Sequence, residues 1–89
     1  MARFEVLDVD TGALGHANVT GDMFFDLGMM YSTASGVPGD LVTAHKWFNI
    51  AAMRGNADAV RLRREVAAEM SEDEIAAAQR AARDWLTRH

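Results

Sequence analysis

The chain has 89 residues, of which 49% are hydrophobic and 25% charged, and it contains no cysteine. This size and composition predict one folded domain with one core, and they exclude disulfides, thiolate metal sites and a cysteine nucleophile. The net charge is -4, which argues against a general attraction to nucleic acid. Positions 1–45 contain six acidic residues and one basic residue, whereas positions 46–89 contain seven acidic and eight basic residues.

Residues 1–20 show no regular periodicity. Phe4, Val6 and Val9 alternate unevenly with acidic residues, and a glycine-containing stretch follows. We therefore expect an extended or irregular segment whose apolar side chains lie against the helices that follow. Acidic residues near the start interrupt the apolar run that a signal peptide needs, and no later run has transmembrane length, so we expect a cytoplasmic protein.

The segment 22–34 is predicted to form a helix with an apolar stripe at i, i+3, i+4 and i+7. Thr20 or Asp22 is suited to cap its first amides, and Pro38 with two glycines ends it. The predicted core stripe consists of Phe24, Leu27, Gly28 and Tyr31.

The same helix carries apolar residues outside that stripe. They are Met23, Phe25, Met29 and Met30. Because methionine is flexible and polarizable, these side chains suit an adaptable contact surface. We expect this second stripe to pack against residues 1–20, a second copy of the chain or a partner, with an ordinary place in the core as the alternative.

The segment 41–54 has the clearest helical pattern, in which large aromatic residues alternate with small ones. Asp40 precedes it as a cap, and Gly55 is placed to end it in a left-handed turn. Small residues allow a neighbouring backbone to come close, and Gly28 suits the same approach. The stripe consists of Ala44, Trp47, Phe48, Ala51, Ala52 and Gly55.

Two further helices are predicted over residues 57–70 and 72–88. Asn56 caps the first, and Ser71 with Glu74 forms a capping box at the second. Short turns predict that all four helices pack as antiparallel neighbours. The apolar faces consist of Ala59, Leu62, Val66 and Met70 in the first helix and Ile75, Ala78, Ala82, Trp85 and Leu86 in the second.

An ordered set of residues runs through positions 27–59. It consists of Leu27, Gly28, Tyr31, Gly36, Val37, Pro38, Asp40, Ala44, Trp47, Phe48, Ala51, Ala52, Gly55, Asn56 and Ala59. This set resembles a Sel1-like repeat, a relative of the tetratricopeptide repeat. The segment from Leu62 to Trp85 is similar to the helical ending that follows the last repeat in short bacterial members.

The resemblance implies an all-α fold of the α-α superhelix type, whose members act as adaptors or scaffolds and have neither catalytic residues nor cofactors. It divides the chain into an irregular segment (1–20), a repeat hairpin (21–56) and a helical pair that caps the repeat (57–89). Two departures matter: Ala34 stands where the family has the first glycine of its turn, and only one repeat is present. Because repeats normally need stacked neighbours, something else must cover the hairpin.

The leading functional hypothesis is a non-enzymatic module that binds a peptide or helix of another protein, with a homo-oligomer as a further option. Isolated histidines predict no metal site. One alternative is a nucleic-acid-associated regulator that uses Arg54 and the cluster of Arg61, Arg63 and Arg64; another is an accessory subunit of an enzyme. The candidate partner-binding residues are Phe25, Asp26, Met29, Met30 and Thr33.

Overall fold

A computed structural model describes residues 11–33 and 40–89, and these two ranges form four helices. The helices are α2 (Thr11–Thr33), α3 (Asp40–Met53), α4 (Ala57–Ala67) and α5 (Glu72–Arg88). The all-α prediction is therefore confirmed over the described ranges. The predictions for residues 1–10 and for the turn at 34–39, including Gly36, lie outside them.

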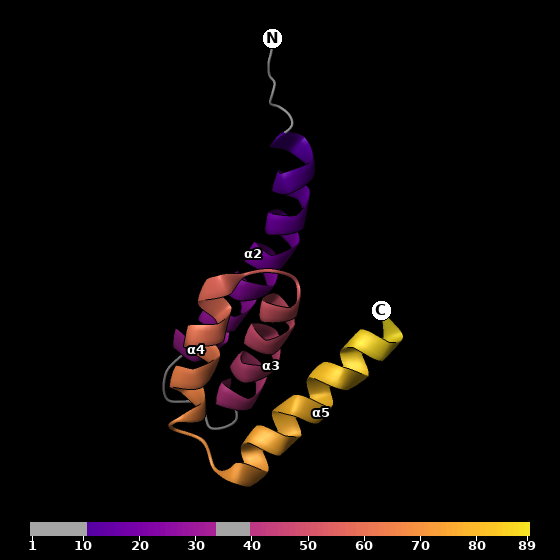
Figure 1. The fold of residues 1–89 in the computed structure, drawn as a ribbon. Helices are drawn as coiled ribbons and strands as arrows, with labels where there is room; N and C mark the ends of the chain where they lie inside the picture. Colours follow the sequence, from indigo (N-terminus) through magenta and orange to yellow (C-terminus); the bar gives the residue numbers. More distant parts are fainter. Residues whose placement is uncertain (1–10, 34–39) are drawn as a thin grey trace.

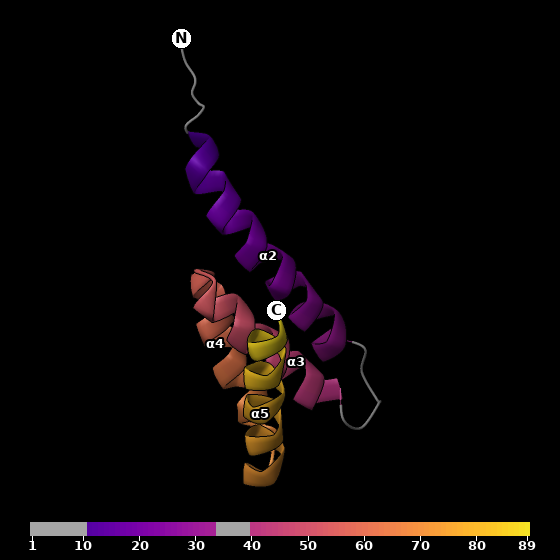
Figure 2. The same ribbon diagram turned by 90° about the vertical axis from the view of Figure 1, so that its right-hand side faces the viewer.

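α3 is the central helix, and α2, α4 and α5 each pack against it. α2 and α3 run antiparallel, as do α3 and α4, whereas α5 packs on α3 at an angle to it (Figure 1). The N-terminal half of α2 extends past the ends of α3 and α4 in both views (Figures 1 and 2). α2 is thus an edge helix of the assembly.

α2 begins much earlier than the sequence indicated. Residues 11–20, predicted to be extended or irregular, are helical. Gly12 and Gly15 favour turns, but a glycine inside a helix costs only about 1 kcal/mol relative to alanine and does not end it. The predicted capping positions, Thr20 and Asp22, accordingly lie inside α2, and the Asp22 carboxylate accepts a hydrogen bond of 2.8 Å from Asn56 Nδ2 instead.

The predicted capping signals at Gly55, Asn56 and Ser71 are confirmed, whereas Asp40, predicted to precede its helix as a cap, is the first residue of α3. The Asn56 side chain accepts a hydrogen bond of 2.9 Å from the Ala59 amide, and Gly55 turns the chain with φ of 99°. At α5 the Ser71 hydroxyl accepts from the Glu74 amide at 3.1 Å, while the Glu74 carboxylate accepts from the Ser71 amide at 2.8 Å. α4 ends at Ala67, before the predicted position 70, and a turn leads to α5.

The core lies between α2, α3 and α4. Phe48 is fully buried, and Ile50 is the other large side chain that is fully buried among the described residues. The predicted apolar faces of α4 and α5 are confirmed, because each is buried or half-buried. The buried core cluster consists of Ala44, Phe48, Ala51, Ala59 and Val66.

Candidate interaction surface

The inner face of α2 is defined by two glycines, Gly21 and Gly28, which lie seven residues or about two turns apart. A Cβ atom at Gly28 would lie 2.5 Å from Cδ1 and Cε1 of Phe48. A Cβ atom at Gly21 would lie 3.0 Å from the carbonyl oxygen of Arg54. The backbone of α2 therefore rests directly on α3 and on the turn that follows it.

The structure confirms Phe24 and Gly28 of the predicted core stripe of α2 and corrects Tyr31. Phe25 contacts the Phe48 ring, with ring centroids 5.6 Å apart, and Met29 packs against the core cluster. Tyr31, predicted as part of the core stripe, is 37% exposed, and Leu27 is half-buried. The Gly28 contact turns α2 so that Phe25 and Met29, rather than Tyr31, face inward.

The outer face of α2 comprises Val19, Met23, Asp26 and Met30. The three apolar members are strongly exposed, at 54%, 60% and 63% respectively. Met23 and Met30 follow Gly21 and Gly28 by two residues, which is a rotation of about 200° in an α-helix. The outer face is therefore nearly opposite the side that rests on α3.

The charge on the outer face is acidic. Asp26 is exposed within the stripe, and Asp22 is exposed at its border. Positions 19–33 contain no lysine and no arginine. Asp22 shares a hydrogen bond with Asn56, whereas Asp26 extends into solvent, so the stripe presents apolar area with an uncompensated carboxylate beside it.

The five predicted partner-binding residues divide between the two sides of α2. Asp26, Met30 and Thr33 are exposed, and the Thr33 hydroxyl donates to the Met29 carbonyl oxygen at 2.8 Å within the helix. Phe25 and Met29 are half-buried against the core. Sequence reasoning placed Met23 in the second apolar stripe but named neither Met23 nor Val19 as a partner-binding residue, although both share one helical face with Met30 by spacing alone.

An aromatic cluster joins α2, α3 and α5. Trp85 contacts both Phe24 and Trp47 edge to face, with centroid distances of 5.1 Å and 5.7 Å, and Phe24 stacks on Trp47 at 5.6 Å. His89 stacks on the Trp85 ring at 4.4 Å. Such ring contacts contribute about 0.5–1.5 kcal/mol each beyond their buried area, so the cluster fixes α5 against α3.

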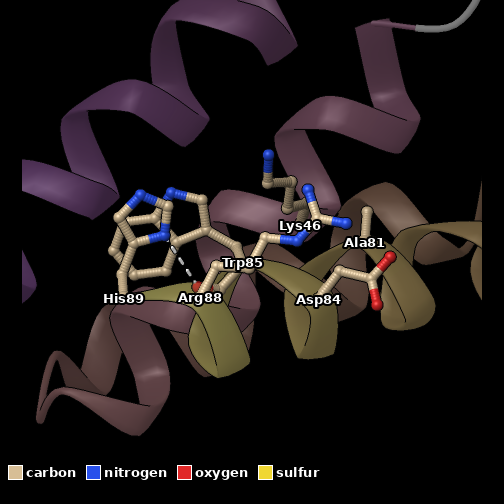
Figure 3. Close-up of a pocket in the computed structure, with 6 residues that line it drawn as sticks. All are labelled: Lys46, Ala81, Asp84, Trp85, Arg88 and His89. Carbon is tan, nitrogen blue, oxygen red and sulfur yellow. Dashed lines mark hydrogen bonds between the residues drawn. The ribbon is translucent and has the colours of Figure 1, made fainter.

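Beside this cluster lies an open pocket of about 260 Å³ between α3 and α5 (Figure 3). The Lys46 ammonium lies 4.3 Å from the centre of the Trp47 ring, and His89 Nδ1 donates a hydrogen bond of 2.9 Å to the Trp85 carbonyl oxygen. In the sequence, the only indication of this pocket is that Trp85 and His89 are four residues apart, which places both rings on the same side of α5. The pocket is lined by Lys46, Ala81, Asp84, Trp85, Arg88 and His89.

The arginine cluster of α4 is partly occupied by intramolecular contacts. Arg61 forms exposed ion pairs with Asp58 at 3.8 Å and Glu65 at 3.3 Å. Arg63 donates a hydrogen bond of 2.6 Å to Asn49 Oδ1 of α3. Arg61 remains 61% exposed but has two carboxylates beside it, and Arg63 is half-buried, so α4 presents less net positive charge than its three arginines indicate.

His45 of α3 is buried, with 3% of its surface exposed. Its Nδ1 atom has no hydrogen-bond partner. Burial, and then the positive charge of Arg63, lower the pKa of His45 below its ordinary value of 6.5. The ring is therefore neutral at physiological pH and belongs to the core.

The residues of the repeat-like pattern occupy positions consistent with a helical hairpin. Asp40 is the first residue of α3, while Trp47 and Ala52 are half-buried. Ala44, Phe48, Ala51 and Ala59 are fully buried. Comparison of the chain with protein-family models, with curated proteins and with solved structures gives no match. The resemblance to Sel1-like repeats stays a prediction.

Within residues 11–33 and 40–89, no helix combines the length and apolar character needed to cross a membrane.

Proposed function

We propose that this chain is a non-enzymatic protein–protein interaction module, an adaptor or scaffold, that binds its partner through the outer face of α2. The observation that carries the proposal is the exposure of Val19, Met23 and Met30 along one side of an edge helix. Exposed apolar patches that are bordered by polar residues typically mark interaction sites.

The packing of α2 supports this proposal. Its inner face packs against Phe48 and the turn at Arg54. The exposed methionines are therefore not needed for the contact between α2 and α3. A helix with apolar residues on both sides is normally buried on both sides. The second side of α2 is open in the described structure, which fits a surface that another protein covers. We further propose a Sel1-like adaptor role and a cytoplasmic location, the latter in keeping with the absence of cysteine.

A pair of matched variants tests the proposal. Met30 on α2 and Met53 on α3 are both 63% exposed, so Met30→Lys and Met53→Lys make the same chemical change at different places. Affinity capture from extracts of the native cell, followed by mass spectrometry, should recover partner proteins with the wild type and with Met53→Lys but not with Met30→Lys. Equal recovery by both variants would refute the role of the outer face.

The two alternatives draw less support. The proposed nucleic-acid surface depends on arginines of which Arg61 and Arg63 already have intramolecular partners. A salt titration with duplex DNA tests it, since binding through phosphate contacts must weaken steeply as salt increases. An accessory subunit of an enzyme would use the same outer face and differ only in the identity of the captured partner.

A further inference from the structure

The shape of the outer face selects the kind of element that can cover it. Val19 and Met30 are eleven residues apart, about three turns, so the apolar stripe is straight and runs along roughly 16 Å of the helix. The backbone donors and acceptors within an α-helix are used in its own hydrogen bonds, so α2 offers no edge on which a β-strand could pair. A second helix, with apolar residues at similar spacing, matches the stripe.

The charge of the outer face selects the polar residues of that helix. Asp22 and Asp26 lie at or beside the stripe, and α2 has no basic residue between positions 19 and 33. A helix that covered Met23 and Met30 would place its flanking side chains near these carboxylates. Complementary lysines or arginines would speed association and stabilise one orientation, whereas acidic residues at the same places would oppose it.

The same charges argue against coverage by the chain itself. Two copies that paired through this face would bring the Asp22 and Asp26 carboxylates of both copies into one interface. Positions 1–10 have three acidic residues, Glu5, Asp8 and Asp10, against one arginine, so that segment is also acidic. Like charges in a shared interface disfavour both arrangements.

We propose that the occupant of the outer face of α2 is an amphipathic α-helix of another protein, with apolar residues along one side bordered by lysine or arginine. This inference rests on the proposed function and specifies its partner. Met23 and Met30 supply the apolar contact, and Asp26 supplies the charge that distinguishes basic from acidic helices.

Two synthetic peptides test the inference directly. The first is an amphipathic helix with leucines along one side bordered by lysines; the second has glutamate at every lysine position and is otherwise identical. Fluorescence anisotropy with the full chain should show at least about tenfold tighter binding of the lysine peptide, because the two differ only in the sign of their flanking charges. Binding of the lysine peptide should weaken as salt increases.

Matched variants locate the site. Asp26→Lys and Glu69→Lys change the net charge by the same amount at exposed positions, but only Asp26 lies on the outer face. We expect Asp26→Lys to weaken lysine-peptide binding by at least about tenfold and Glu69→Lys to change it by less than about threefold. Met30→Lys should abolish binding, and Met53→Lys should leave it intact. Circular dichroism of each variant verifies that the helices remain folded.

Three results would overturn the inference. Equal affinity for the two peptides would show that charge does not select the partner. If the lysine peptide fails to bind but capture of proteins from extracts still depends on Met30, the basic-helix inference is refuted and the proposed function is retained. If the peptide fails to bind and capture does not depend on Met30, the inference and the proposed function are both refuted. Concentration-dependent dimerisation in sedimentation experiments that Met30→Lys abolishes would assign the outer face to a second copy.

Discussion

The contact between Gly28 and Phe48 fixes which side of α2 faces outward, and Gly28→Ala is the direct perturbation of it. The added Cβ atom would lie 2.5 Å from two ring carbons and 3.0 Å from a third. Carbon atoms in contact are normally about 3.5–4.0 Å apart, so the ring or the helix must move by about 1 Å. Phe48 is fully buried, and Phe25 packs against its ring, which limits that movement.

The magnitude follows from two opposed effects. Overpacking a filled core costs about 1–3 kcal/mol. The high end applies here because the added Cβ atom would lie 2.5 Å from two carbons of the Phe48 ring. Replacing glycine by alanine inside a helix gains about 1 kcal/mol of helix propensity. We therefore expect Gly28→Ala to lower the free energy of unfolding by about 2 kcal/mol, which for a domain of this size corresponds to a fall in Tm of about 8–16 °C.

Urea denaturation followed by circular dichroism measures this difference. Phe48→Leu removes Cε1 and the planar ring and so relieves part of the overlap with the new methyl group, which should make the double variant more stable than the sum of the two single effects indicates. A Gly28→Ala variant that is as stable as the wild type, or more stable, would refute the close approach of α2 to α3.

Three further perturbations have defined outcomes. Burial lowers the pKa of His45 below 6.5, so the folded state resists protonation of the ring. The stability that the neutral ring contributes is fully present above pH 6.5 and is lost as pH falls below that value. His45→Leu should therefore make the free energy of unfolding less dependent on pH, as measured by denaturation at successive pH values. Asn56→Ala removes the acceptor for the Ala59 amide and should cost about 1 kcal/mol in urea denaturation, with Asn56→Ser retaining much of the cap. In Gly55→Ala the added Cβ atom has no neighbour within 4 Å, but the alanine must adopt a positive φ. The free energy of unfolding should therefore fall by about 1–2 kcal/mol in the same assay, and an unchanged value would show that the turn relaxes.

Sequence reasoning located α3, the start of α4 and both ends of α5 because their signals are local. The capping box at Ser71 and Glu74 and the positive φ at Gly55 depend on residues within one turn, and both are recognisable without knowledge of the fold. The central stripe around Phe48 was equally clear, since its large and small residues repeat at the helical period.

The orientation and length of α2 could not be obtained in the same way. α2 has apolar residues on more than one side, so periodicity alone does not determine which side is buried. The deciding contact joins Gly28 to Phe48, which is 20 positions away in the chain, and it turns Phe25 and Met29 inward. Likewise, the packing of α5 on α3 depends on contacts of Trp85 with Phe24 and Trp47, which are distant in sequence.

Methionine-methyl NMR tests the role of the outer face of α2 most directly, because the methionines lie on different surfaces of the protein. Met23 and Met30 are on the outer face, Met53 is exposed on α3, and Met70 packs against the core. When methyl-labelled protein is titrated with the lysine peptide, we expect the Met23 and Met30 signals to shift progressively while those of Met53 and Met70 stay in place. Shifts confined to Met53 or Met70, with Met23 and Met30 unchanged, would contradict docking on α2.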